Sequence, residues 1–133
     1  MSTDAQIAAF LGEALPGLIA VYRFGSTAGR QTHAESDIDV AFLAAEPVAA
    51  PTRFELQERL AARLRRDVDL IDLSRASTVM RMQVISTGLL LAAVDRQAQE
   101  RFEDLTYSAY ARLNEERREI LEQVHREGRV YGG

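Results

Sequence analysis

A Gly-Ser pair and an Asp-x-Asp triplet lie between two strand-like segments, and this arrangement constrains the fold more than any other feature of the chain. Gly25-Ser26 follows the first segment, and Asp37 and Asp39 begin the second. Because successive side chains of a strand alternate between its faces, Asp37 and Asp39 are expected to point the same way. The two segments, rich in apolar and β-favouring residues, are residues 19–24 (IAVYRF) and 38–43 (IDVAFL).

Two neighbouring carboxylates require a partner if they are both ionised. They repel each other, and burying them unpaired costs several kcal/mol. A divalent cation resolves this conflict, and carboxylate oxygens suit Mg²⁺ bound to nucleotide phosphates. A Gly-Ser turn and an Asp-x-Asp strand start each have an ordinary structural explanation when taken singly. Their combination in one strand–turn–strand context predicts phosphate chemistry.

A third carboxylate is offered by the segment DVDLIDL at residues 67–73. Alternation places Asp67 and Asp69 on one face of this predicted strand and Asp72 on the other. Asp69 is central, with Val68 and Leu70 on either side, where an acidic residue has the least structural reason to occur. Asp69 is therefore the preferred third acid, and Asp72 is the alternative.

The remaining pattern predicts an α+β protein with a small mixed sheet and helices packed mainly on one face. Ser2-Thr3-Asp4 can cap a first helix, and Gly88 can end a short helix over residues 77–87. The run LLLAAV is continuous in apolar residues, which favours a buried strand. The other expected elements are a loop at residues 46–51, a helix over 52–66, the strand around Asp69, and a strand over 89–94.

A long helix is predicted from Asp95, a plausible N-cap, to Glu127, because the segment contains no proline or glycine before Gly128. A helix of this length extends beyond a sheet of four short strands, since each residue adds about 1.5 Å. We expect its first half to face the core and residues 113–124 to dock on another chain. Its apolar positions, mostly three or four residues apart, are Phe102, Leu105, Ala109, Leu113, Ile120, Leu121 and Val124.

Length and composition favour one domain over residues 1–133, comprising a catalytic core at 1–94, the helix at 95–127 and a tail at 128–133. The absence of cysteine excludes disulfides and thiolate metal sites. A net charge of −4 argues against direct nucleic-acid binding. No secretory signal and no run long enough to span a membrane is recognisable, so a cytoplasmic protein is expected.

The motif formed by Gly25, Ser26, Asp37 and Asp39 resembles that of the nucleotidyltransferases of the DNA polymerase beta type. The chain looks closest to the minimal nucleotidyltransferases, small single-domain proteins that often pair with a HEPN-domain toxin. The resemblance covers most of the chain, from the opening helix through the last strand. It also places the third acid in a Val-Asp-Leu strand like that around Asp69.

The resemblance implies an antitoxin that transfers AMP from ATP to a tyrosine hydroxyl of a HEPN ribonuclease toxin. Gly25 and Ser26 would then contact the triphosphate, and Asp37, Asp39 and Asp69 would hold Mg²⁺ and carry the catalysis. Arg30 could reach the triphosphate. Related proteins have arginine then glycine here, however, whereas this chain has Gly29 then Arg30.

The sequence is also compatible with two other functional hypotheses. The chain could mask a toxin sterically without catalysis, or it could be the catalytic subunit of an enzyme that nucleotidylates a small molecule. His33, in the segment between Ser26 and Asp37, is better explained as a surface-loop residue than as a ligand. The absence of further domains to grip an acceptor favours a protein acceptor that brings its own binding surface.

Overall fold

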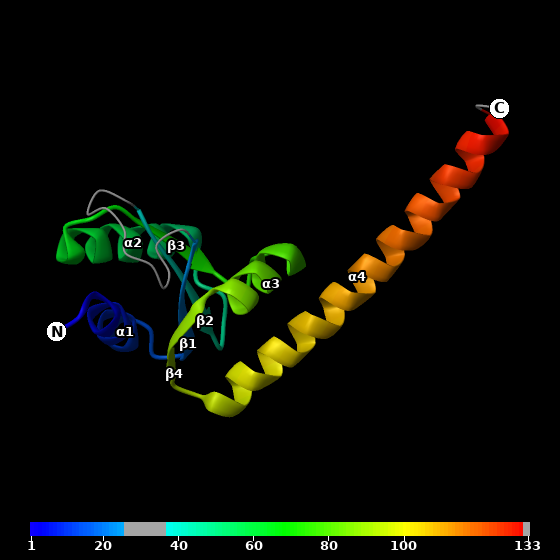
Figure 1. The fold of residues 1–133 in the computed structure, drawn as a ribbon. Helices are drawn as coiled ribbons and strands as arrows, with labels where there is room; N and C mark the ends of the chain where they lie inside the picture. The colour runs from blue at the N-terminus through cyan, green and yellow to red at the C-terminus, as the bar shows by residue number, and fades with distance from the viewer. Residues whose placement is uncertain (26–36, 132–133) are drawn as a thin grey trace.

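The computed structural model describes residues 1–25 and 37–131, which form a four-stranded sheet and four helices (Figure 1). In chain order the elements are α1 (Thr3–Ala14), β1 (Leu18–Phe24), β2 (Ile38–Ala44), α2 (Ala50–Leu64), β3 (Val68–Asp72), α3 (Thr78–Thr87), β4 (Leu89–Ala93) and α4 (Arg96–Tyr131). The predicted α+β class and the long C-terminal helix are confirmed.

The sheet is mixed, with strand order β3-β2-β1-β4. β1 is central and pairs antiparallel with β2 and with β4, whereas β2 pairs parallel with β3. A parallel pair needs a crossover connection, and α2 supplies it between β2 and β3. As a result, the starts of β2 and β3 lie side by side at one end of the strands, next to the last residue of β1.

Helices cover both faces of the sheet, rather than mainly one face as the sequence suggested. On one face, α1 and α2 pack through Ile7, Leu11 and Leu60 onto inward-facing strand residues such as Val40. The opposite face, around Tyr22, Ala41 and Leu73, is covered by Val84 and Met80 of α3 and by Phe102 of α4. The expectation that the first half of the long helix faces the core is confirmed by Phe102. The side covered by α3 was not predicted, because this helix buries a single apolar residue, Val84.

Local chemistry explains the helix ends. The Ala5 backbone N–H donates to Ser2 Oγ (3.1 Å), and the Ala98 N–H donates to Asp95 Oδ1 (3.1 Å), so both predicted N-caps are present. α2 begins at Ala50, two residues before the predicted start, because Pro51 is tolerated in the first turn of a helix. α4 continues to Tyr131, past the predicted end at Glu127.

β4 differs from the prediction of a buried strand. It lies at the edge of the sheet and pairs only with β1, and Leu89 and Leu90 are 43% and 41% exposed. A continuous apolar run shows that a strand can be buried, but it does not give the position of the strand in the sheet. The opposite edge is formed by β3, which also carries Asp69.

Buried polar contacts join α4 to the central strand. The Tyr22 hydroxyl donates to Glu103 Oε2 (2.7 Å), and Gln99 Nε2 donates both to the Tyr22 hydroxyl (3.1 Å) and to Glu103 Oε2 (2.6 Å). Burial raises the pKa of Tyr22, which therefore stays a hydrogen-bond donor. This network fixes the first turns of α4 on the sheet, while the rest of the helix projects away from the body (Figure 1).

Candidate active site

Three predicted site residues meet at the end of the sheet where β1 ends and β2 and β3 begin. Asp39 of β2 and Asp69 of β3 are register partners in the parallel pair, and Phe24, the last residue of β1, pairs with Asp39 on the other side. Gly25 follows Phe24 directly and lies beside the Asp39 carboxylate. The strand pairing alone thus brings together residues 14 and 30 positions apart in the chain.

Asp39 and Asp69 also share a face of the sheet. Each alternates with residues of the opposite side, so Asp39 lies on the same face as Ala41, and Asp69 on the same face as Ile71. That face is the one covered further along by α3 and α4. The two carboxylates lie outside the part of the face that α3 and α4 cover. Asp39 is partly buried and Asp69 is exposed.

The electrostatics of Asp39 reflect this neighbourhood. The pKa of Asp39 is raised, first by burial and then by the negative charges of Asp69 and Asp37. A carboxylate that is partly desolvated and faces two like charges is destabilised in its ionised form. A bound cation would reverse this effect, because it replaces repulsion among the carboxylates with attraction to a common charge.

The donor chemistry fits Mg²⁺, since carboxylates with nucleotide phosphates and water are its usual ligands. The side chains do not form a ready-made cage. Across residues 1–25 and 37–131, no group of three or more His, Cys, Asp or Glu side chains is placed to hold a metal ion. Because Mg²⁺ in nucleotide sites takes only one or two carboxylates and the rest of its oxygens from phosphate and water, an all-protein cage is not required.

Gly25 has a structural role that the sequence did not reveal. Its φ angle is +82°, a conformation that residues with a Cβ rarely adopt. A Cβ built on Gly25 would also overlap Asp39 Oδ2. The glycine therefore makes room for the Asp39 carboxylate. Ser26, Arg30 and His33 lie outside the described residues.

Asp72, the alternative third acid, is placed differently. It is 4% exposed and lies on the α2 side of the sheet, opposite to the face of Asp69. Its Oδ2 accepts from the Val48 N–H (3.0 Å) and its Oδ1 from the Ser74 N–H (2.9 Å). Both oxygens thus organise the backbone on either side of β3, and neither faces Asp39.

The matching family is described as Polymerase beta, Nucleotidyltransferase, and it matches residues 6–97. The chain is 40% identical over 121 residues to protein adenylyltransferase MntA of Shewanella oneidensis. The aligned region covers 91% of this chain and 86% of that protein. The match includes β1, β2 and β3, the strands that bring Gly25, Asp39 and Asp69 together. This chain belongs to the polymerase beta nucleotidyltransferase family.

Solved structures agree with this assignment. One is a tri-AMPylated Shewanella oneidensis HEPN toxin in complex with an MNT antitoxin (TM-score 0.77, 38% identity, covering 92% of this chain and 95% of that chain). Another is a toxin–antitoxin structure with AMP-PNP (TM-score 0.81, 40% identity, covering 91% and 97%). Within the described residues, no helix is both long and apolar enough to cross a membrane.

Proposed function

We propose that this chain is an antitoxin that transfers AMP from ATP to a tyrosine hydroxyl of a HEPN ribonuclease toxin. The observation that carries the proposal is the parallel register of Asp39 with Asp69 beside Gly25. This geometry supports the proposal because it places two carboxylates next to a glycine whose backbone a phosphate can approach. The similarity to an adenylyltransferase and to a toxin–antitoxin complex supports the choice of substrate and partner.

In this proposal Asp37, Asp39 and Asp69 hold Mg²⁺, and Gly25 and Ser26 contact the triphosphate. Bound Mg²⁺ supplies positive charge that stabilises the phosphate oxygens and the pyrophosphate leaving group. Gly25 leaves the backbone bare where the phosphates approach. The role of Ser26, and a contact from Arg30, rest on the sequence motif.

The tyrosine oxygen forms a bond to the α-phosphorus of ATP, and the bond from that phosphorus to the bridging oxygen of the β-phosphate breaks. Pyrophosphate leaves, and the tyrosine proton passes to the Asp69 carboxylate. Asp69 is suited to this step because it is exposed and register-paired with Asp39. Positioning and charge stabilisation dominate such transfers, so no covalent intermediate on the protein is needed.

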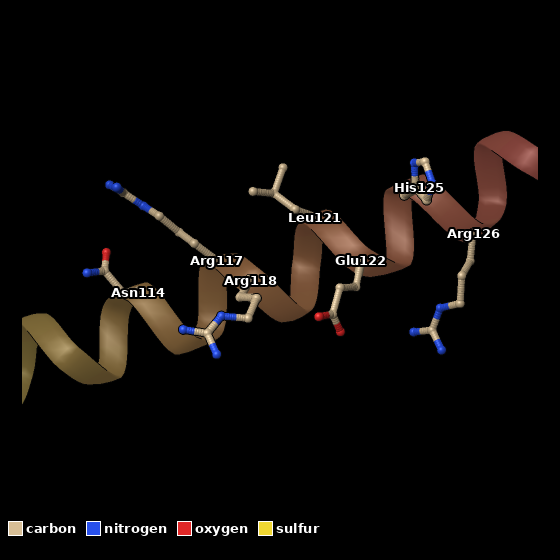
Figure 2. A pocket seen from close by; sticks show the side chains of 7 residues that line it. All are labelled: Asn114, Arg117, Arg118, Leu121, Glu122, His125 and Arg126. Atoms are coloured by element: carbon tan, nitrogen blue, oxygen red, sulfur yellow. The ribbon is translucent and has the colours of Figure 1, made fainter.

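The distal half of α4 offers a surface for the partner. Side chains of this half, among them Arg117, Leu121 and His125, extend outward from the helix and form an open surface (Figure 2). Three neighbouring apolar side chains, Ile120, Leu121 and Val124, which we call the distal apolar patch, are 60%, 68% and 58% exposed. An apolar patch on a projecting helix supports docking on the toxin.

The same patch favours one alternative, in which the chain neutralises the toxin by steric masking without chemistry. A single experiment separates the two. The toxin is incubated with this chain, Mg²⁺ and ATP labelled at the α-phosphate, and is then separated from it under mild denaturation and refolded. Transfer predicts a labelled toxin whose ribonuclease activity stays lost. Masking predicts an unlabelled toxin that regains its activity, and that result would overturn the proposed function.

A further inference from the structure

A cavity of about 350 Å³, lined by both charged and apolar residues, opens beside Asp69 at the free edge of β3. Two arginines from different elements line it together with Asp69. They are Arg53 of α2 and Arg75, which follows β3 in the turn before α3. Whatever occupies this cavity lies next to the carboxylate that we place beside the attacking hydroxyl. In the proposed reaction, the cavity therefore lies on the side of the acceptor.

Arg53 is fixed at the wall of the cavity. Its Nη1 donates to the carbonyl oxygen of Leu70 (3.0 Å), and it lies 3.4 Å from Gln57 Oε1. Gln57 Oε1 in turn accepts from the Leu70 N–H (2.9 Å). The two α2 side chains thus satisfy the peptide groups of Leu70 on the unpaired edge of β3. This blocks strand addition there and holds a positive charge in place.

Arg75 is held at one end and open at the other. Its Nε donates to the Val48 carbonyl (3.1 Å) and lies 3.9 Å from Asp72 Oδ2. Asp72 already accepts two backbone N–H groups, so it does not engage the whole guanidinium. The Arg75 side chain is 59% exposed, and within the described part of the chain its two terminal nitrogens make no hydrogen bond. A planar guanidinium anchored in this way suits a phosphate or carboxylate.

We propose that this cavity binds an oxyanion carried by the acceptor, with Arg75 as the residue that contacts it. The inference rests on the proposed function. An acidic group close to the attacking hydroxyl would be repelled by Asp69 and its neighbours, and Arg75 offsets that repulsion. The oxyanion has two sources: the phosphodiester of an AMP group added earlier, or a carboxylate beside the acceptor tyrosine. The tri-AMPylated toxin of the related complex is an acceptor to which more than one AMP was added.

The test compares Arg75→Gln with Arg96→Gln, which removes the same charge from an exposed position in the first turn of α4. Intact-mass time courses follow the first and the later AMP additions to the toxin. A phosphodiester source predicts that Arg75→Gln slows only the later additions, about tenfold for one charged hydrogen bond. A carboxylate source predicts a similar rise in the KM for the unmodified toxin, with the KM for ATP unchanged. Additions that all proceed as in wild type would overturn the proposal.

A second measurement stands apart from catalysis. Titration calorimetry compares binding of a tyrosine peptide, its O-adenylylated form and a form with glutamate beside the tyrosine. We expect one of the two anionic peptides to bind wild type and the Arg96→Gln variant at least tenfold more tightly than the Arg75→Gln variant. If wild type transfers no AMP but this difference persists, the proposed activity fails and the anion site stands. If all peptides bind the variants equally, the anion site fails.

Discussion

The Asp39 carboxylate fills the space that a Cβ on Gly25 would need. The end of β1 and the start of β2 are thereby matched in shape as well as in hydrogen bonding, and Gly25 also holds a φ of +82°. A Gly-Ser turn is usually explained by glycine's conformational freedom or by close approach of a phosphate. Here the glycine is additionally required by the acid that the motif places beside it.

Gly25→Ala should therefore be doubly unfavourable. We expect a loss of about 1–3 kcal/mol in the free energy of unfolding, from backbone strain and displacement of Asp39, and a loss of ATP binding. Urea unfolding and nucleotide titration measure the two effects. Gly12→Ala is the matched control, because a Cβ at this position in α1 meets nothing within 4 Å. It should stabilise the protein by about 0.5–1 kcal/mol. Equal effects of the two substitutions would show that Gly25 is not constrained by its φ angle or by Asp39.

Asp39→Asn should stabilise the protein in the absence of Mg²⁺. The pKa of Asp39 is higher in the folded protein than in the unfolded chain. At pH values above the folded-state pKa, ionisation of Asp39 therefore lowers the stability of the folded protein. The variant should melt at a higher temperature than wild type near neutral pH. The difference should shrink in mildly acidic buffer, as the wild-type carboxyl becomes protonated through its raised pKa. Thermal melts across this pH range, in chelator, measure the difference. A difference that stays constant with pH would show that ionisation of the partly buried Asp39 carboxyl is not its cause.

Asp72→Asn and Asp69→Asn should distinguish a carboxylate that stabilises the fold from one that does not. An amide at Asp72 puts an NH₂ group opposite either the Val48 or the Ser74 N–H, so one buried hydrogen bond is lost. This should cost about 1–3 kcal/mol of stability by urea unfolding. Asp69 is exposed, and its substitution should leave the unfolding midpoint nearly unchanged. The reverse ranking would mean that Asp69 supports the fold.

Ile120→Arg should weaken binding to the HEPN toxin while leaving the isolated chain folded, since this side chain of the distal apolar patch is 60% exposed. Loss of one apolar anchor costs about 2 kcal/mol, or roughly thirtyfold in affinity. Ala111→Arg adds the same charge on the opposite side of α4, nine residues earlier, and should bind as wild type. Calorimetric titration and circular dichroism give the two readouts. Equal affinity of both variants would remove the patch from the interface.

The sequence predicted the strands that carry Asp39 and Asp69 because short-range patterns determine them. Alternation within residues 67–73 correctly separated Asp69 from Asp72, and Ser2 and Asp95 were recognisable as caps. The sheet order was not predictable in this way. The exposure of β4 depends on its position at an edge, and the cavity beside Asp69 depends on α2 bringing Arg53 next to β3. The overlap between Gly25 and Asp39 likewise requires the strand register, which a single sequence does not reveal.

In the proposed reaction Asp69 acts in AMP transfer, whereas Gly25 and Asp39 bind the nucleotide. The most direct measurement is incorporation of labelled AMP into the HEPN toxin by Asp69→Asn, with ATP affinity determined on the same preparation. We predict that ATP binding and toxin binding are retained and that transfer falls about a hundredfold or more, as for loss of a general base. Transfer at the wild-type rate by Asp69→Asn would contradict this prediction.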